Sequence, residues 1–343
     1  MLLIREKSLD TPFCRYPFQK LKICSNGDVN FCCFQRDGTC IDNILEVSLE
    51  RIWNSRLAKD VRYATSNGEL HKFCQQEGCP FYHRKDKLAG VHDPDAVFTK
   101  FPIDIELDLP MQHCNIGGLD PKAGTVCIMC ERATRFEKQE DRVDEICDVL
   151  RPYAKHIRFL HIQGIAESFW KDRIFEVVDR IGIDVQKTRI TTYTNGTILG
   201  GERLTKWLKY PWTCTTFSID AAKPETYKKI RIWDAYERII ANMTELSRRR
   251  CHPYQSLQIH NNINMLNINE VEGMVEIAAQ VKADYLSFNP THHFGDNEVS
   301  NNNVHLFKEA QTKIIKRAAQ INVNVGFIRD FGLDLVPLVQ ISL

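Results

Sequence analysis

The chain has 343 residues, of which 43% are hydrophobic, and its 45 basic and 44 acidic residues give a formal net charge of +1. That apolar fraction is ordinary for a globular protein, and the length suggests about two domains on a prior of ~150 residues each. The balanced charge argues against binding nucleic acid through bulk charge, and no apolar run approaches the ~20 residues that span a bilayer.

The amino terminus and the cysteines indicate the compartment and the chemistry. The start, MLLIREKSLD, becomes charged after a few positions, which is unlike a signal peptide. The 13 cysteines are better explained by metal binding than by disulfides, because the cytosol keeps thiols reduced. We therefore expect a cytoplasmic, metal-binding protein without a membrane segment.

Residues 1–90 are rich in cysteine and predict a small domain of a β-hairpin and a helix. In residues 20–34, alternating segments flank Asn26-Gly27-Asp28, a sequence that favours the positive φ of a tight turn. Residues 48–65 carry apolar side chains at helical spacing behind Ser48, a good N-cap, and predict a helix. Residues 91–102, polar and interrupted by Pro and Gly, predict a linker.

From residue 103 the pattern alternates between strands and helices. The expected strands are 103–109, 157–164, 188–194, 214–220, 257–264 and 283–290, each followed by a helical segment. Such β/α units form either a doubly wound sheet or a barrel, with functional side chains at the carboxyl ends of the strands. We assign residues 103–300 to this region and 301–343 to a C-terminal helix and extension.

Three cysteines, Cys114, Cys127 and Cys130, lie between the first strand of this region and its first helix. A structural zinc site normally uses four ligands, and His113 is a poor fourth because it adjoins Cys114. Three thiolates on a four-iron cluster would leave one iron open for a substrate or cofactor, since such clusters otherwise take four cysteines. A zinc knuckle completed by a distant ligand, or plain buried thiols, are the alternatives that spacing alone leaves open.

The segment LPMQHCN…CIMC resembles the cluster loop of the radical S-adenosylmethionine (SAM) enzymes, although the family's short first spacing is widened here to twelve residues. Widening the spacing costs roughly 1 kcal/mol of loop-closure entropy. Similar stretches follow in the family's order: IQGIAES, YTNGTIL, FSIDAAKPETYKKIR and residues 262–290. The resemblance covers residues 103–290 and implies an α/β fold, a partial (β/α)6 TIM-like barrel.

The resemblance also implies cofactors and their ligands. Cys114, Cys127 and Cys130 would hold a 4Fe–4S cluster whose open iron binds SAM. The expected SAM contacts are Met129, Gly164, Glu167, Asn195, Ser218 and Asn262. Glu167 would meet the SAM amino group, and its alternative is a solvated carboxylate at a helix start. The reduced cluster would cleave SAM to a 5′-deoxyadenosyl radical that takes a hydrogen atom from the substrate.

Two candidate catalytic residues follow from the same resemblance. Asp220 would point into the cavity, with His260 and Asn262 also near strand ends. Cys214 could return a hydrogen atom to a substrate radical in an epimerisation, as could Cys33 or Cys251. For each thiol and for His260, an inert buried position is the alternative.

The N-terminal cysteines resemble the SPASM or twitch domain, which carries auxiliary Fe–S clusters in many radical SAM enzymes. The resemblance lies in the spacing from Cys14 through Gly27 to Cys32, in residues 42–62 and in CQQEGCPFY. It implies one auxiliary 4Fe–4S cluster on Cys14, Cys32, Cys74 and Cys79, with Cys33 able to replace Cys32, and Cys24 and Cys40 as spare candidates. This module usually follows the barrel but precedes it here. A four-cysteine zinc ribbon is the alternative, because closed sulfur sites suit either metal.

The resemblance implies a radical SAM enzyme that modifies a peptide by epimerisation, cross-linking or oxidation. A sugar or small metabolite is the alternative substrate, and flavodoxin or ferredoxin the expected type of electron donor. Two other classes are a non-catalytic, zinc-stabilised binding protein and an RNA-modifying enzyme. The near-neutral charge speaks against the RNA-modifying enzyme.

Overall fold

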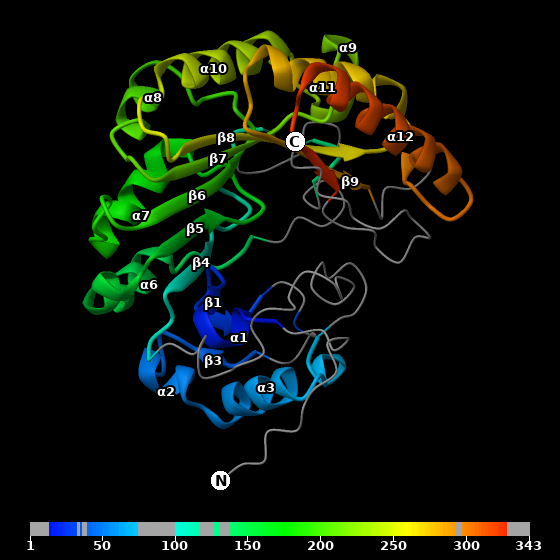
Figure 1. Ribbon diagram of the computed structural model, residues 1–343. Coiled ribbons are helices and arrows are strands. Elements are labelled where there is room, and N and C mark those ends of the chain that lie inside the picture. Colours follow the sequence, from blue (N-terminus) through cyan, green and yellow to red (C-terminus); the bar gives the residue numbers. More distant parts are fainter. Residues whose placement is uncertain are drawn as a thin grey trace.

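The computed structural model describes residues 14–32, 35, 40–74, 100–116, 127–130, 138–291 and 297–327. In these residues the strands form a single sheet with the order β10-β9-β8-β7-β6-β5-β4-β1-β2-β3. The order ends at β10 and β3 without closing, so the sheet is an open, partial barrel. Figure 1 shows the sheet curving beneath an outer layer of helices, with the N-terminal region at one edge.

The six predicted strands of the β/α region are all present, and a seventh follows them. They are β4 (Asp104–Asp108), β5 (Phe159–Gln163), β6 (Arg189–Thr194), β7 (Thr213–Ser218), β8 (Gln255–Ile263), β9 (Tyr285–Pro290) and β10 (Val325–Phe327). Each pairs with the next in parallel. The partial (β/α)6 barrel predicted from the sequence is therefore confirmed.

Helices connect these strands on the outer face. They are α6 (Val143–Leu150), α7 (Arg173–Ile181), α8 (Gly201–Trp207), α9 (Pro224–Arg231), α10 (Tyr236–Arg249), α11 (Val271–Gln280) and α12 (Val304–Ile321). Short 3-10 turns occupy Arg151–His156, Trp170–Asp172 and Ile268–Glu270. None of the helices in the described ranges combines the length and apolarity needed to cross a bilayer.

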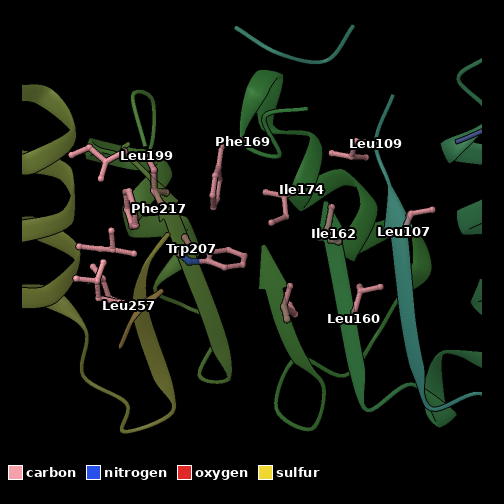
Figure 2. Packing of buried hydrophobic residues seen from close by; sticks show 14 of the residues in the cluster. Leu107, Leu109, Leu160, Ile162, Phe169, Ile174, Leu199, Trp207, Phe217 and Leu257 are labelled. Carbon is pink, nitrogen blue, oxygen red and sulfur yellow. The ribbon is translucent and has the colours of Figure 1, made fainter. Parts of the chain in front are cut away.

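The two faces of the sheet differ in polarity because successive residues of a strand point to opposite sides. Leu107, Leu160, Ile162, Phe217 and Leu257 face the helices and are fully buried (Figure 2). Between them, the strands turn polar side chains to the concave face: Glu106, His161, Thr191, Thr216, Ser218, His260, Asn262, Ser287 and Asn289. The convex face thus provides the core, and the concave face is a polar surface.

The N-terminal region contains the predicted hairpin of β1 (Lys20–Ile23) and β2 (Asp28–Asn30), with Gly27 at φ +96° in the turn. The remaining elements are α1 (Tyr16–Gln19), β3 (Asp42–Asn43), α2 (Leu49–Trp53), α3 (Arg56–Ser66) and a 3-10 turn at Leu70–Lys72.

The prediction of one helix over residues 48–65 is wrong, because the helix breaks at Asn54. Ser48 caps α2 as expected, and Ser55 caps α3 by accepting a 3.2 Å hydrogen bond from the Ala58 amide. Ser55 therefore competes with helix continuation and starts a second helix.

The N-terminal region shares its sheet with the barrel. β1 pairs in parallel with β4, and Lys20 and Lys22 lie opposite Asp104 and Glu106. The Nζ atoms of Lys20 and Lys22 lie 2.6 Å and 2.9 Å from the two carboxylate oxygens of Glu106, and Lys22 also pairs with Asp108. This buried ion-pair cluster joins the two regions across the sheet.

Candidate functional site

A cavity of about 270 Å³ opens at the carboxyl ends of the parallel strands, and all three loop cysteines line it. The rest of its wall comes from residues that end or follow β5 to β8, together with the end of α9. These are Gly164, Ile165, Ala166, Tyr193, Thr194, Asn195, Ser218, Asn262 and Arg231, with Ile116 and Met129 from the cysteine loop. Despite the widened cysteine spacing, Cys114, Cys127 and Cys130 therefore line the wall of one cavity.

Hydrogen bonds hold the two ends of the cysteine loop together. The side-chain amide of Gln112 donates to the Gln139 carbonyl at 2.7 Å, and the Met111 amide donates to the Gln139 side chain at 2.8 Å. Next to this pair, Nε2 of His113 lies 2.7 Å from Asp141. The base of the loop is thus fixed on both sides of the cysteines.

Further contacts fix the cysteine segments against the strands. The side-chain amide of Asn195 donates to Asn115 at 2.8 Å, and that of Asn115 donates to Thr197 at 2.8 Å, which fastens the Cys114 side to the end of β6. On the other side, the Ile128 amide donates to the Ile230 carbonyl at 3.0 Å. The Cys127–Cys130 turn is therefore held against the end of α9.

The three thiols fit an Fe–S cluster by their chemistry and their common cavity. Three cysteines provide the incomplete ligand set that leaves one iron open. Burial raises the pKa of Cys127, although the nearby Arg231 opposes that effect. Among the residues that the structure describes, no three His, Cys, Asp or Glu side chains are already gathered as a metal site. The three thiols therefore line one cavity wall without forming a preassembled metal site in this structure.

Five of the six predicted SAM contacts line this cavity, and their role remains a prediction. They are Met129, Gly164, Asn195, Ser218 and Asn262. Gly164 has φ +118°, and a Cβ there would lie 2.4 Å from the Leu109 carbonyl oxygen. Only glycine allows the ends of β4 and β5 to approach this closely.

Glu167, the sixth predicted contact, is fully buried and is not among the cavity-lining residues. Its carboxylate accepts hydrogen bonds from the Thr194 hydroxyl at 2.8 Å and the Asn195 amide at 2.7 Å. Burial raises its pKa to about 7, despite these donors. The solvated alternative is therefore wrong, and in this structure Glu167 supports the end of β6.

Asp220 is also buried behind the cavity wall, which corrects the expectation that it points inward. It has φ +54°, pairs with Arg231, and accepts a 2.7 Å hydrogen bond from the Asn262 amide. Arg231 itself lines the cavity, and its Nε has no hydrogen-bond partner among the described residues. No spacing in the sequence singles out Arg231, because its position depends on the end of α9.

The structure does not bring the other candidate thiols into the cavity. Cys214 is the second residue of β7 and lies about 13 Å along the strand from Ser218, at ~3.3 Å per residue. Cys251 is exposed ahead of β8, and Cys33 lies outside the described residues. His260 is buried with Nδ1 2.8 Å from the Ser287 hydroxyl, as its alternative reading expects.

The predicted auxiliary ligands come from separate segments of the N-terminal region. Cys14, Cys32 and Cys74 are partly buried, whereas Cys79 lies outside the described residues. An isolated backbone bridge pairs Cys74 with Gln35, which brings the end of the region back to the hairpin. This ligand set therefore remains a prediction.

Two family models match the chain: an iron–sulfur cluster-binding SPASM domain over residues 14–80 and the radical SAM superfamily over residues 110–278. The chain therefore belongs to the radical SAM superfamily, with an SPASM domain ahead of its radical SAM domain. These domains imply 4Fe–4S clusters and SAM as cofactors, as predicted.

Solved structures show similar folds at low sequence identity. SuiB from Streptococcus suis bound to S-adenosylmethionine is 13% identical, with a TM-score of 0.48, and the match covers 90% of this chain and 71% of that chain. Another SuiB structure has 13% identity and a TM-score of 0.46, covering 81% of this chain and 58% of that one. Native anSMEcpe with bound AdoMet and the Cp18Cys peptide has 16% identity and a TM-score of 0.42, covering 62% and 57%.

The chain thus spans only 57% to 71% of the length of these solved structures. No curated protein matches it in sequence.

Proposed function

We propose that this radical SAM enzyme cleaves SAM reductively in the cavity and abstracts a hydrogen atom from a peptide, which is then epimerised, cross-linked or oxidised. The observation that supports the proposal best is the arrangement of the cavity wall. Cys114, Cys127 and Cys130 line the same cavity as five predicted SAM contacts.

The residues of the wall suit a zwitterionic, nucleoside-containing ligand. The three thiols would hold the cluster, which together with SAM supplies the radical chemistry. The Arg231 guanidinium, oriented by Asp220, is suited to a carboxylate. Asn195 and Ser218 offer hydrogen-bonding side chains, while Ile116 and Ile165 provide apolar wall that limits water.

The concave face favours a peptide substrate over a polyanion. Its Ser, Thr, Asn and His side chains can donate and accept the hydrogen bonds that peptide backbone groups need when they are buried. Lys20 and Lys22 on this face are already paired with Glu106 and Asp108. Arg189 adds one further cation on this face, so only a little positive charge is left for phosphates. Sugars use the same kinds of hydrogen bonds and form the alternative.

The cleavage test is anaerobic reconstitution with iron and sulfide, followed by dithionite and SAM. We expect 5′-deoxyadenosine from the wild-type chain, and none above background from Cys114→Ser, Cys127→Ser or Cys130→Ser. Cys251→Ser is the matched control, because Cys251 is exposed and away from the cavity. A colourless zinc protein that forms no 5′-deoxyadenosine would refute the proposal and support the zinc-stabilised binding protein.

The substrate test adds a randomised peptide library or a panel of monosaccharides to the active enzyme. Mass spectrometry should detect changed masses among the peptides only. Changed sugars with unchanged peptides would favour the alternative substrate. Replacing dithionite by flavodoxin or ferredoxin would test the expected electron donor.

A further inference from the structure

Three adjacent strands place an aspartate, a histidine and a threonine in a continuous chain of contacts on the concave face. Nε2 of His161 lies 3.0 Å from Oδ1 of Asp104, and Nδ1 of His161 forms a hydrogen bond with the Thr191 hydroxyl. Thr191 lies directly opposite His161 in the register of β5 and β6. A carboxylate, an imidazole and a hydroxyl that contact one another in this order can activate the hydroxyl for proton transfer.

Asp104 is the carboxylate available to His161. Glu106 lies opposite His161 in register, but Lys20 and Lys22 pair with both of its oxygens. Oδ1 of Asp104, in contrast, is buried, and its ion-pair contact among the described residues is the one with Nε2 of His161 at 3.0 Å. This carboxylate, which also lies within electrostatic reach of Lys20, would stabilise an imidazolium at His161.

The chain of contacts lies one side-chain layer below the cofactor cavity. Thr191 and Tyr193 are on the same strand and face, about 7 Å apart at ~3.3 Å per residue, and Tyr193 lines the cavity. Gly164, which also lines the cavity, follows His161 by three residues. The His161 side chain keeps 25% of its surface exposed. A substrate on the concave face beside the cavity would therefore reach this layer.

The surroundings leave His161 without a competing anion. The charged groups that face it from β1, β4 and β6 are Lys20, Lys22, Asp104, Glu106, Asp108 and Arg189. The lysines, Glu106 and Asp108 pair with one another. Arg189 lies in register beside Phe159, two residues from the His161 position. Asp104 is thus the acidic group in ion-pair contact with His161.

We propose that Asp104, His161 and Thr191 form a proton relay for the substrate, an inference that rests on the proposed function. Thr191 is the catalytic residue that touches the substrate, and His161 and Asp104 are positioning residues behind it. An acidic N–H, O–H or C–H bond of the substrate breaks, and its proton moves to the Thr191 oxygen as the Thr191 proton moves to Nδ1 of His161. The bonding electron pair stays on the substrate. The resulting imidazolium is stabilised by Asp104 and later returns the proton to water.

The first test determines which imidazole nitrogen carries the proton. In the full chain labelled with 15N-histidine, nuclear magnetic resonance should show His161 protonated on Nε2 and unprotonated on Nδ1, with His161→Gln identifying its signals. Asp104→Asn should change these signals, because the carboxylate is lost. A proton on Nδ1, or signals unaffected by Asp104→Asn, would overturn the relay.

The second test measures modification of the randomised peptide library. Thr191→Val and His161→Gln should each lower it by about 10²-fold or more, the contribution typical of acid–base groups. Thr191→Ser keeps the hydroxyl and should restore most of the activity, and Thr244→Val, an exposed threonine on α10, is the control. Thr244→Val should match wild type in both peptide modification and 5′-deoxyadenosine formation.

The outcomes separate the two proposals. Equal peptide modification by Thr191→Val and wild type would overturn the relay while the cleavage proposal stands. Absence of 5′-deoxyadenosine from the wild-type chain would instead remove the proposed function, and the relay would then be decided by the protonation of His161.

Discussion

The barrel and the N-terminal region position their cysteines in different ways. In the barrel, Cys114, Cys127 and Cys130 come from one loop whose ends are held by Gln112 and Gln139, and they line one cavity. In the N-terminal region, the predicted ligands come from segments separated by strands and helices. A ligand set on one loop depends on a few local contacts. A dispersed set depends on the folding of the whole region.

The two regions are nevertheless parts of one sheet and one apolar core. β1 lies beside β4, and Leu21 and Trp53 belong to the same buried cluster as Ile105 and Leu107. We therefore expect mutations to destabilise the N-terminal region more than the barrel. Because the two regions share a sheet, we also expect part of that loss of stability to reach the barrel. The following substitutions test this difference.

The largest effect is expected for Trp53→Ala. Trp53 is fully buried, with the Arg62 guanidinium 4.1 Å from its ring centroid. Truncating such a side chain costs about 3–5 kcal/mol of unfolding free energy. Denaturant unfolding should show this loss, together with lower iron content in the N-terminal region. Trp212→Ala is the control, because Trp212 is 37% exposed. Two unfolding transitions, of which only one shifts to lower denaturant concentration in Trp53→Ala, would show that the two regions unfold separately.

A smaller loss is expected for Lys22→Met in the ion-pair cluster. The substitution leaves Asp108 without its lysine, while Lys20 still pairs with Glu106. We expect a loss of about 2–3 kcal/mol, below the full cost of breaking a buried pair. Lys187→Met removes an exposed pair with Asp184 and should leave the unfolding free energy nearly unchanged. Equal losses from the two variants would contradict a structural role for the cluster.

The same variant should alter the response to acid. Burial alone would raise the pKa of Glu106, but Lys22 and Lys20 lower it to about 2, from an ordinary value of 4.5. A lowered carboxyl pKa stabilises the fold above the ordinary value, and that contribution is lost as the pH falls from 4.5 to about 2. In Lys22→Met, tryptophan fluorescence should report acid unfolding at a higher pH than in wild type.

The smallest effect is expected for Gln139→Ala at the base of the cysteine loop. Hydrogen bonds of this kind contribute about 0.5–1.5 kcal/mol each. Iron content and 5′-deoxyadenosine formation should therefore fall several-fold, with little change in unfolding free energy. Gln186→Ala, on an exposed turn, is the control. A large drop in stability would mean that the loop is not a local unit.

The sequence predicts those features that depend on neighbouring residues. The strand and helix periods of the barrel are local, as is the close spacing of Cys127 and Cys130 after the first strand. The pairing of β1 with β4 joins residues 84 positions apart and has no local signal. The same holds for the contact of Arg231 with Asp220 and for that of His161 with Asp104. Glu167 shows a related limit of prediction from sequence. A glutamate at this position suits a contact with the SAM amino group, but its burial depends on the packing of β6.

The place of β1 in the sheet has a consequence for synthesis of the chain. One edge of β1 has its parallel partner only after β4 has been made, and chains emerge from the ribosome with the amino terminus first. Until then, Lys20–Ile23 presents an unpaired strand edge, which is a template for pairing with other chains. During translation, rapid arrival of Asp104–Asp108 would therefore protect the nascent N-terminal segment from pairing with other chains.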